Sequence, residues 1–134
     1  MELRVYYEDT DAAGVVYHAN YLKYFERART EYLRERDLCV SLLAASGYVF
    51  PVVRMEIDFK APALHDDLLK IVTIPERITG SSLTFQQQAI RLVDSKLLVD
   101  SRVTLACIGP NHKARRIPGS VRQLLEMECK QSAL

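Results

Sequence analysis

Hydrophobic and polar positions follow two different periods along this chain of 134 residues. Between about residue 20 and about residue 36, apolar residues recur at three- and four-residue spacing, while charged residues fall on the other faces. This pattern predicts an amphipathic helix, with Asn20 in the position of the N-cap. The apolar face of the predicted helix consists of Tyr21, Phe25, Ala28 and Tyr32.

The later part of the chain has a period of two, which is typical of half-buried strands. Four long strands are predicted, at residues 49–59, 68–78, 83–93 and 97–108. Pro51, near the start of the first of these, indicates a sheet edge or a bulge. Short turns at 80–82 and 94–96 predict an antiparallel meander.

Shorter elements complete the prediction: a strand at 3–7, a short helix near 40–46 that Gly47 stops, and a final short helix at 118–128. One long helix and an alternating sheet can bury their apolar faces against each other if the sheet curves around the helix. We therefore expect an α+β fold in a single domain spanning residues 1–134. Long antiparallel strands leave unpaired edges, so we also expect a homo-oligomer.

Composition and charge narrow the class of protein. A net charge of +1 gives no case for nucleic-acid binding, which usually depends on a concentrated basic face. No apolar run approaches the roughly 20 residues that cross a bilayer, so no transmembrane segment is predicted. The first residues, MELRVYYEDTD, are too polar for a signal peptide, and we expect a cytoplasmic protein.

Cysteine and histidine spacing indicates no metal site. The three cysteines are widely spaced and are expected to be buried free thiols. The histidines have no metal-ligand spacing, so we predict no bound metal. These residues are Cys39, Cys107 and Cys129, and His18, His65 and His112.

The stretch DTDAAGVVYHANY, at residues 9–21, gathers polar residues just before the predicted helix. Taken singly, Asp9, Asp11 and Gly14 are ordinary turn or cap residues. Taken together they suit thioester hydrolysis, because backbone N–H groups at a helix N-terminus form an oxyanion hole for the attacked carbonyl. Asp11 would attack the carbonyl carbon or activate a water, and His18 would orient that water.

Two further groups of charged residues have alternative interpretations. Glu26 is either a second carboxylate or, as we favour, a surface partner of Arg27 or Arg29. The basic run after the last strand is either a solvated loop or a site for the phosphates of a nucleotide-bearing molecule. This run consists of Lys113, Arg115 and Arg116.

The order VYYEDTDAAGVVYHANYLKYFERARTEYL resembles the hotdog-fold acyl-CoA thioesterases of the 4-hydroxybenzoyl-CoA thioesterase family. In particular, it resembles the branch associated with the Tol-Pal system of Gram-negative bacteria. The resemblance implies hydrolysis of acyl-CoA to free acid and CoA, with CoA as part of the substrate and no separate cofactor. It also implies a homodimer or homotetramer with active sites at the subunit interface, and it admits acyl carrier protein as a partner and a position peripheral to the inner membrane.

Site residues follow from this resemblance position by position. The family's catalytic aspartate corresponds to Asp11, the second of the D-x-D pair, its histidine to His18, and its tyrosine to Tyr7. The backbone around His18 corresponds to the oxyanion region. The expected substrate-binding residues are Gly14, Val15, Val16 and Tyr17, with Lys113, Arg115 and Arg116 for the CoA phosphates.

Two departures from the family are informative. The 4-hydroxybenzoyl branch has an aromatic residue followed by proline where this chain has His18 and Ala19. This difference weakens the case for an aromatic substrate. The Tol-Pal branch has basic residues in the turn before its penultimate long strand, whereas residues 79–82 here have none. The basic residues near 113–116 are therefore the remaining candidates for holding CoA.

Two other functions stay open at this point. A hotdog dehydratase acting on β-hydroxyacyl thioesters would place its acid on the central helix, at Glu26. A non-catalytic module for acyl carriers or envelope proteins would bind acyl-CoA without turnover, although it would need neither Asp11 nor His18.

Overall fold

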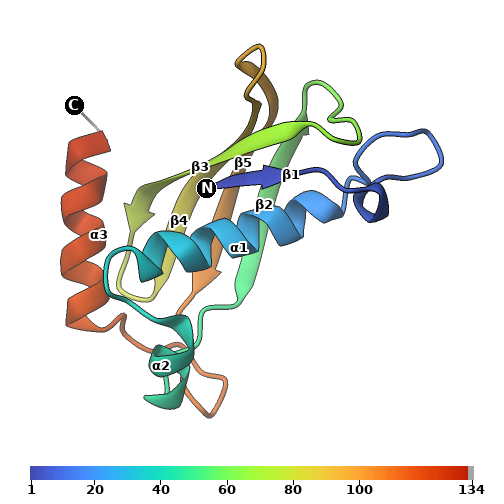
Figure 1. Cartoon of the computed structure of the whole chain (residues 1–134). Helices are drawn as coiled ribbons and strands as arrows, with labels where there is room; N and C mark the ends of the chain where they lie inside the picture. Colours follow the sequence, from blue (N-terminus) through green and yellow to red (C-terminus); the bar gives the residue numbers. More distant parts are fainter. Residues whose placement is uncertain (133–134) are drawn as a thin grey trace.

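The computed structural model describes residues 1–132. Five strands form one antiparallel sheet in the order β1-β3-β4-β5-β2, and the sheet curves around helix α1 (Figure 1). The strands are β1 (Glu2–Arg4), β2 (Val52–Phe59), β3 (Leu68–Ile78), β4 (Ser82–Arg91) and β5 (Lys96–Ala106). The helices are η1 (Tyr7–Asp9), α1 (Asn20–Arg34), α2 (Val40–Ala45) and α3 (Gly119–Ser132). The predicted α+β architecture, a curved sheet around one long helix, is confirmed.

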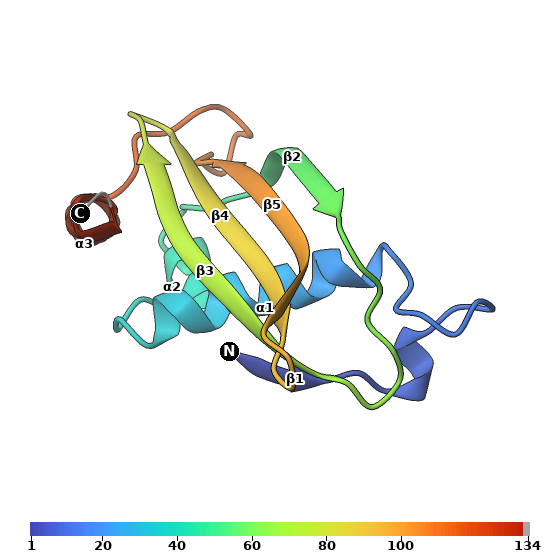
Figure 2. The same cartoon turned by 90° about the horizontal axis from the view of Figure 1, so that it is seen from above.

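Helix α1 lies against the concave face of the sheet, as Figure 2 shows from above. The predicted apolar face is the buried one: Phe25 is fully buried, and Tyr21, Ala28 and Tyr32 are nearly so. Burying one large apolar side chain contributes about 1.5–3 kcal/mol, so this face holds the helix in place. Two clusters of core residues surround its two ends.

The start of α1 differs from the prediction. Ala19, not Asn20, is the N-cap, and it makes no capping hydrogen bond through its side chain. Asn20 is the first helical residue, and its side-chain amide donates to the backbone oxygen and to Oδ1 of Asp9, at 3.3 and 3.1 Å. The predicted Asn20 cap is therefore wrong: the helix already includes Asn20, and the Asn20 side chain donates through its amide nitrogen to Asp9, eleven residues away, instead of accepting from a backbone N–H as a cap does.

The pairing of the strands explains most differences from the predicted bounds. Strand β3 matches its prediction, and β3, β4 and β5 form the expected meander. Strand β2 pairs with β5 at the end of the sheet and begins later than predicted, because Val49 makes only an isolated bridge to Ile108. The register of β2 shifts between Val52 and Arg54, close to Pro51. The first strand is shorter than predicted because Tyr7 enters the 3-10 helix η1.

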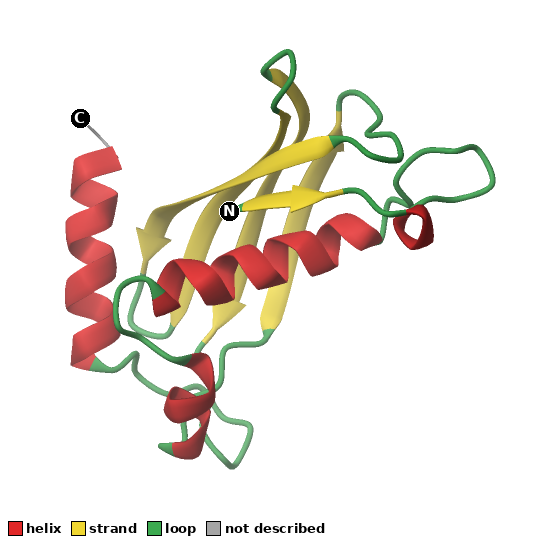
Figure 3. Ribbon diagram, viewed as in Figure 1, coloured by secondary structure: helices red, strands yellow, loops and turns green. Residues whose placement is uncertain are grey.

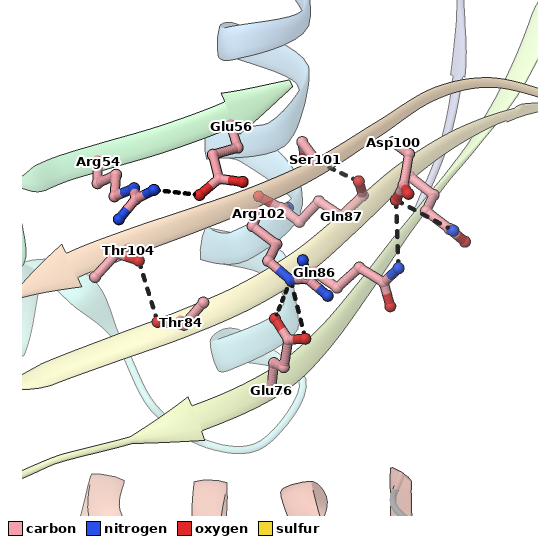
Figure 4. A network of polar contacts seen from close by, with 11 residues as sticks. Arg54, Glu56, Glu76, Thr84, Gln86, Gln87, Asp100, Ser101, Arg102 and Thr104 are labelled. Carbon is pink, nitrogen blue, oxygen red and sulfur yellow. Dashed lines mark hydrogen bonds and ion pairs between the residues drawn. The ribbon is translucent and has the colours of Figure 1, made fainter. Parts of the chain in front are cut away.

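The face of the sheet that points away from α1 is polar (Figure 4). Thr84 and Thr104 share a hydrogen bond of 3.1 Å across β4 and β5, and Arg102 forms an ion pair of 2.8 Å with Glu76. These side chains alternate with buried ones along each strand. Cross-strand pairs stabilise a sheet, while an exposed ion pair contributes only about 0–1 kcal/mol.

The C-terminal helix α3 stands beside the sheet (Figure 3) and buries Val121 and Leu125 in the core. It is longer than the predicted helix at 118–128. All three cysteines are free, but only Cys107 is buried; Cys39 and Cys129 are half-buried, so the expectation of buried thiols holds for one of the three. No helix of the described residues is long and apolar enough to span a membrane.

The core around Phe85 provides a test of this packing. Phe85 is 1% exposed and its ring centroid lies 5.9 Å from that of Tyr32. We expect Phe85→Ala to lower the free energy of unfolding by about 3–5 kcal/mol, because it leaves a cavity between α1 and β4. Urea denaturation at one fixed protein concentration measures the change. Val93→Ala, at a position 88% exposed, is the control and should shift stability by less than about 0.5 kcal/mol; equal effects of the two variants would contradict this assignment of the core.

Candidate active site

The loop between η1 and α1 folds back on itself like a small hairpin. Thr10 and Val16 form an antiparallel bridge, and the N–H of Asp11 donates to the oxygen of Val15 at 2.9 Å. Gly14 makes the turn with φ +80, a conformation that strains residues with a side chain. A Cβ at Gly14 would meet no atom within 4 Å. The bend itself, rather than a close approach, therefore requires this glycine.

The loop is fixed against the segment that follows β2. Val15 forms an isolated bridge with Leu64, and the N–H of Val16 donates to the oxygen of Ala63 at 2.9 Å. The N–H of Tyr17 donates to the oxygen of Asp9, also at 2.9 Å. These bonds join three parts of the chain, so the loop has a defined position beside the entrance of α1.

The two aspartates of the loop have different surroundings. Asp9 is occupied on both carboxylate oxygens: Oδ2 accepts from the N–H of Tyr6 at 2.8 Å, and Oδ1 accepts from Asn20. Asp11 is exposed, and its Oδ1 accepts from the N–H of Ala13 at 2.9 Å. Its Oδ2 has no hydrogen-bond partner among residues 1–132. Asp9 therefore stabilises the turn, as expected, while Asp11 has an oxygen available for chemistry.

An open depression of about 360 Å³ lies between this loop, the start of α1 and the end of β2. Its lining comprises Asp11, Val15, Val16, His18, Tyr21, Phe59, Lys60, Ala61 and Pro62. The ring of His18 stands edge-on to that of Phe59, with centroids 6.3 Å apart. Burial raises the pKa of Tyr21, so its hydroxyl stays protonated. Residues 59–62 were not predicted as site residues; the sequence signal for them is the Ala61-Pro62 pair, which follows β2 and turns the chain back beside the loop.

Few backbone donors are free at the entrance of α1. The N–H groups of residues 20, 21 and 22 donate back to the oxygens of residues 17, 18 and 19, at 2.8, 3.4 and 3.1 Å. The N–H groups of His18 and Ala19 make no hydrogen bond within the described part of the chain. Free donors at a helix N-terminus favour a negatively charged or polarised oxygen. The expected oxyanion donors are thereby narrowed to these two positions.

The structure does not bring every predicted site residue to the depression. Tyr7 is 79% exposed, and its ring lies edge-on to His65 rather than beside Asp11. The rings of Tyr17 and His18 are 4.6 Å apart, but Tyr17 does not line the depression. Gly14 shapes the loop from outside the lining. Of the expected binding residues in the loop, only Val15 and Val16 are part of the cavity wall.

The basic run lies at the opposite end of α1, beside α2 (Figures 1 and 2). Arg115 donates to the oxygen of Gly47 at 2.9 Å, and its guanidinium carbon lies 3.9 Å from the ring centroid of Tyr48. Lys113 and Arg116 are exposed. Within a single chain, these residues are therefore separate from the depression at Asp11, because the helix and the sheet hold the two loops apart.

Glu26 and His18 line different cavities of the chain. Oε1 of Glu26 accepts from the hydroxyl of Thr30 at 3.1 Å, and among the described residues Glu26 forms no ion pair with Arg27 or Arg29, although its charge raises the pKa of Arg29. Glu26 lines a second cavity that shares no residue with the depression. A dehydratase pair of His18 and Glu26 is thus not assembled within one chain. Among the described residues, no group of three or more His, Cys, Asp or Glu side chains is arranged to hold a metal ion.

Comparison with known proteins agrees with this geometry. Residues 13–97 match a family model described as the thioesterase superfamily. Acyl-CoA thioester hydrolase YbgC of Escherichia coli O6:H1 is 42% identical over 120 residues, which cover 89% of each chain. Acyl-CoA thioesterase YbgC of Haemophilus influenzae is 44% identical over 107 residues, covering 79% of this chain and 77% of that relative.

Solved structures show the same arrangement of sheet and helix. The crystal structure of a probable thioesterase from Bartonella henselae is 41% identical, with a TM-score of 0.82 over 88% of this chain and 97% of that one. The family match covers more than half of the chain and begins inside the loop that contains Asp11. This chain, with its sheet curved around α1, therefore belongs to the thioesterase superfamily and has the hotdog fold.

Proposed function

We propose that this protein hydrolyses acyl-CoA thioesters to a free acid and CoA, with Asp11 as the catalytic carboxylate. The observation that carries the proposal is the placing of Asp11 and His18 in one depression at the entrance of α1. Asp11 has an unpartnered oxygen there, and the N–H of His18 is a free donor among the described residues. Similarity to two acyl-CoA thioesterases supports the choice of substrate class.

The chemistry follows from these positions. The thioester oxygen accepts from the N–H of His18, where the positive end of the α1 dipole stabilises the negative charge that develops during attack. Asp11 either attacks the carbonyl carbon, forming a mixed anhydride and releasing the CoA thiolate, or removes a proton from an attacking water. The imidazole of His18 orients the water. Val16 and Phe59 provide apolar contacts for the first carbons of the acyl chain.

A second copy of the chain completes the site in this proposal. Strand β2 is an edge strand of the sheet, and its outer edge pairs with no other described strand. Its exposed hydrophobic residues include Val52, Val53 and Phe59, and Phe59 also lines the depression. Pairing of two copies along β2 would satisfy this edge and cover the open depression. The basic run of the second copy would then be available to hold the CoA phosphates.

The remaining features of the proposal rest on the resemblance alone. They are the pairing of dimers into a tetramer, acyl carrier protein as an alternative carrier, and a cytoplasmic position at the inner membrane. An aliphatic acyl group is preferred over an aromatic one because His18 and Ala19 replace the aromatic-proline pair of the 4-hydroxybenzoyl branch.

Asp11→Asn tests the catalytic assignment. We expect kcat/KM for an aliphatic acyl-CoA to fall at least about 100-fold, because the amide is neither a nucleophile nor a base. Release of free thiol measures turnover, and urea denaturation should show unchanged stability. Asp37→Asn, at an exposed position after α1, is the matched control and should retain full turnover. Undiminished turnover in Asp11→Asn would remove Asp11 from the mechanism.

A single turnover in ¹⁸O-water separates the two roles of Asp11. If Asp11 attacks the carbonyl and water then opens the anhydride at the aspartyl carbon, ¹⁸O appears in Asp11. If Asp11 acts as a base, or if water opens the anhydride at the acyl carbon, ¹⁸O appears only in the released acid, and capture of the anhydride by hydroxylamine then distinguishes the two. Mass spectrometry of the peptide that contains Asp11, after one turnover with enzyme in excess, reads the outcome.

Val53→Asp tests the dimer. Val53 is 60% exposed on β2, and a charge at a buried subunit interface is strongly unfavourable. We expect light scattering to show monomers, and we expect turnover to fall because the dimer is lost. Val93→Asp, in the exposed turn before β5, should leave both unchanged. A Val53→Asp protein that stays dimeric and active would contradict pairing along β2.

A further inference from the structure

A second cavity, of about 100 Å³, lies along the C-terminal half of α1. Helices α1, α2 and α3 and strands β4 and β5 all contribute to its wall. Most of the lining is apolar and includes Leu33, Leu43, Phe50, Leu83, Phe85 and Leu105. The polar part of the wall consists of Glu26, Arg29 and Thr30. A few convergent polar groups in an apolar wall are typical of a small-molecule site, and the small volume of this cavity has room only for a short ligand.

Arg29 is the unusual residue of this wall. It is only 8% exposed, although it carries a charge, and burial lowers its pKa. Arginine nevertheless remains protonated in proteins. Within the described residues, Nη1 of Arg29 donates a hydrogen bond to Oε1 of Gln87 at 3.0 Å. No carboxylate of the described residues forms an ion pair with Arg29. A buried charge without a directly paired opposite charge is costly. The cavity wall at Arg29 therefore favours a negatively charged partner.

Gln87 holds the guanidinium in position. Gln87 is fully buried, and its Nε2 donates to the oxygen of Phe25 at 2.9 Å and to the hydroxyl of Thr73 at 3.0 Å. Because both donors of the amide are used, its Oε1 is directed to Arg29. Only one of the five N–H donors of the guanidinium is occupied in this way. Arg29 is therefore a preorganised donor with further N–H groups at the cavity.

Glu26 does not neutralise Arg29 directly. It is exposed and accepts a hydrogen bond from Thr30 rather than from Arg29. Its charge raises the pKa of Arg29, which opposes the effect of burial. Since the carboxylate of Glu26 is in contact with water, its charge is screened. The positive charge thus lies inside the cavity wall and the negative charge at its solvent side.

We propose that this cavity binds a free aliphatic carboxylic acid, with the carboxylate paired to Arg29 and the chain among the apolar residues. Guanidinium and carboxylate form strong, often bidentate hydrogen bonds, and the ligand supplies the direct ion pair that no carboxylate of the described chain makes with Arg29. The ligand belongs to the same chemical class as the acid released by the proposed reaction. Binding here does not depend on that reaction, because the cavity shares no residue with the depression at Asp11.

Calorimetry with butanoate and butan-1-ol tests the inference on the full chain. The two ligands have the same chain length, but only butanoate has a carboxylate. We expect the wild-type protein to bind butanoate at least tenfold more tightly than butan-1-ol. Arg29→Met should weaken butanoate binding at least tenfold and change butan-1-ol binding less than about twofold. Arg27→Met, an exposed arginine of the same helix, is the matched control and should bind both ligands like the wild type.

A second variant avoids any change to the buried arginine. Val40 lines the cavity from α2 and is 38% exposed, so Val40→Trp fills the cavity from its solvent side. We expect it to abolish binding of both ligands while circular dichroism stays unchanged. Equal affinity of the wild type for butanoate and butan-1-ol, unchanged butanoate affinity in Arg29→Met, or full binding in Val40→Trp would each overturn the inference.

The same titration in Asp11→Asn separates this inference from the proposed function. We expect butanoate to bind this variant as it binds the wild type. Loss of the Arg29 dependence would overturn the acid site and leave the role of Asp11 intact. Full turnover in Asp11→Asn would overturn the proposed mechanism and leave the acid site intact.

Discussion

The burial of one face of α1 against the concave sheet is the constraint on which the rest of the structure depends. Tyr21, Phe25 and Ala28 reach β3, β4 and β5 through one continuous core. Since interiors are packed as densely as crystals of small molecules, this contact fixes the position and direction of the helix. The entrance of α1, and with it the loop that contains Asp11, is thereby held beside the end of β2.

In the loop before α1, hydrogen bonds fix the backbone and Asp9, while one carboxylate oxygen of Asp11 has no protein partner among the described residues. Asp9 uses both of its carboxylate oxygens, on Tyr6 and Asn20, to join the loop to the helix. Asp11, two residues later, keeps one oxygen without a protein partner. A site with positioned donors and little reorganisation is what electrostatic stabilisation of a transition state requires. The roles proposed for these two neighbouring aspartates therefore differ because their contacts differ, although their side chains are chemically the same.

The interior of the fold is not uniformly apolar. Along β4 the buried positions are Leu83, Phe85, Gln87 and Ala89. Gln87 breaks this apolar series, yet its amide is fully bonded, and Ser101 donates to its backbone oxygen at 2.9 Å. Such a network is tolerated because its members are satisfied. Arg29 is the exception, since its guanidinium has a hydrogen bond to Gln87 but no direct ion pair with a carboxylate of the described chain.

The sequence by itself determined the two periods, and with them the long helix, the four long strands and the α+β class. It also identified Asp11, Gly14 and His18 as candidate site residues, because they stand at fixed spacing before a helix that periodicity reveals. Only the tertiary structure decided that β2 lies at the sheet edge beside β5, that Asn20 bonds Asp9 instead of capping, and that the basic run is remote from Asp11. The physical reason is that these features depend on contacts between residues far apart in the chain, whereas periodicity and turn chemistry describe only near neighbours.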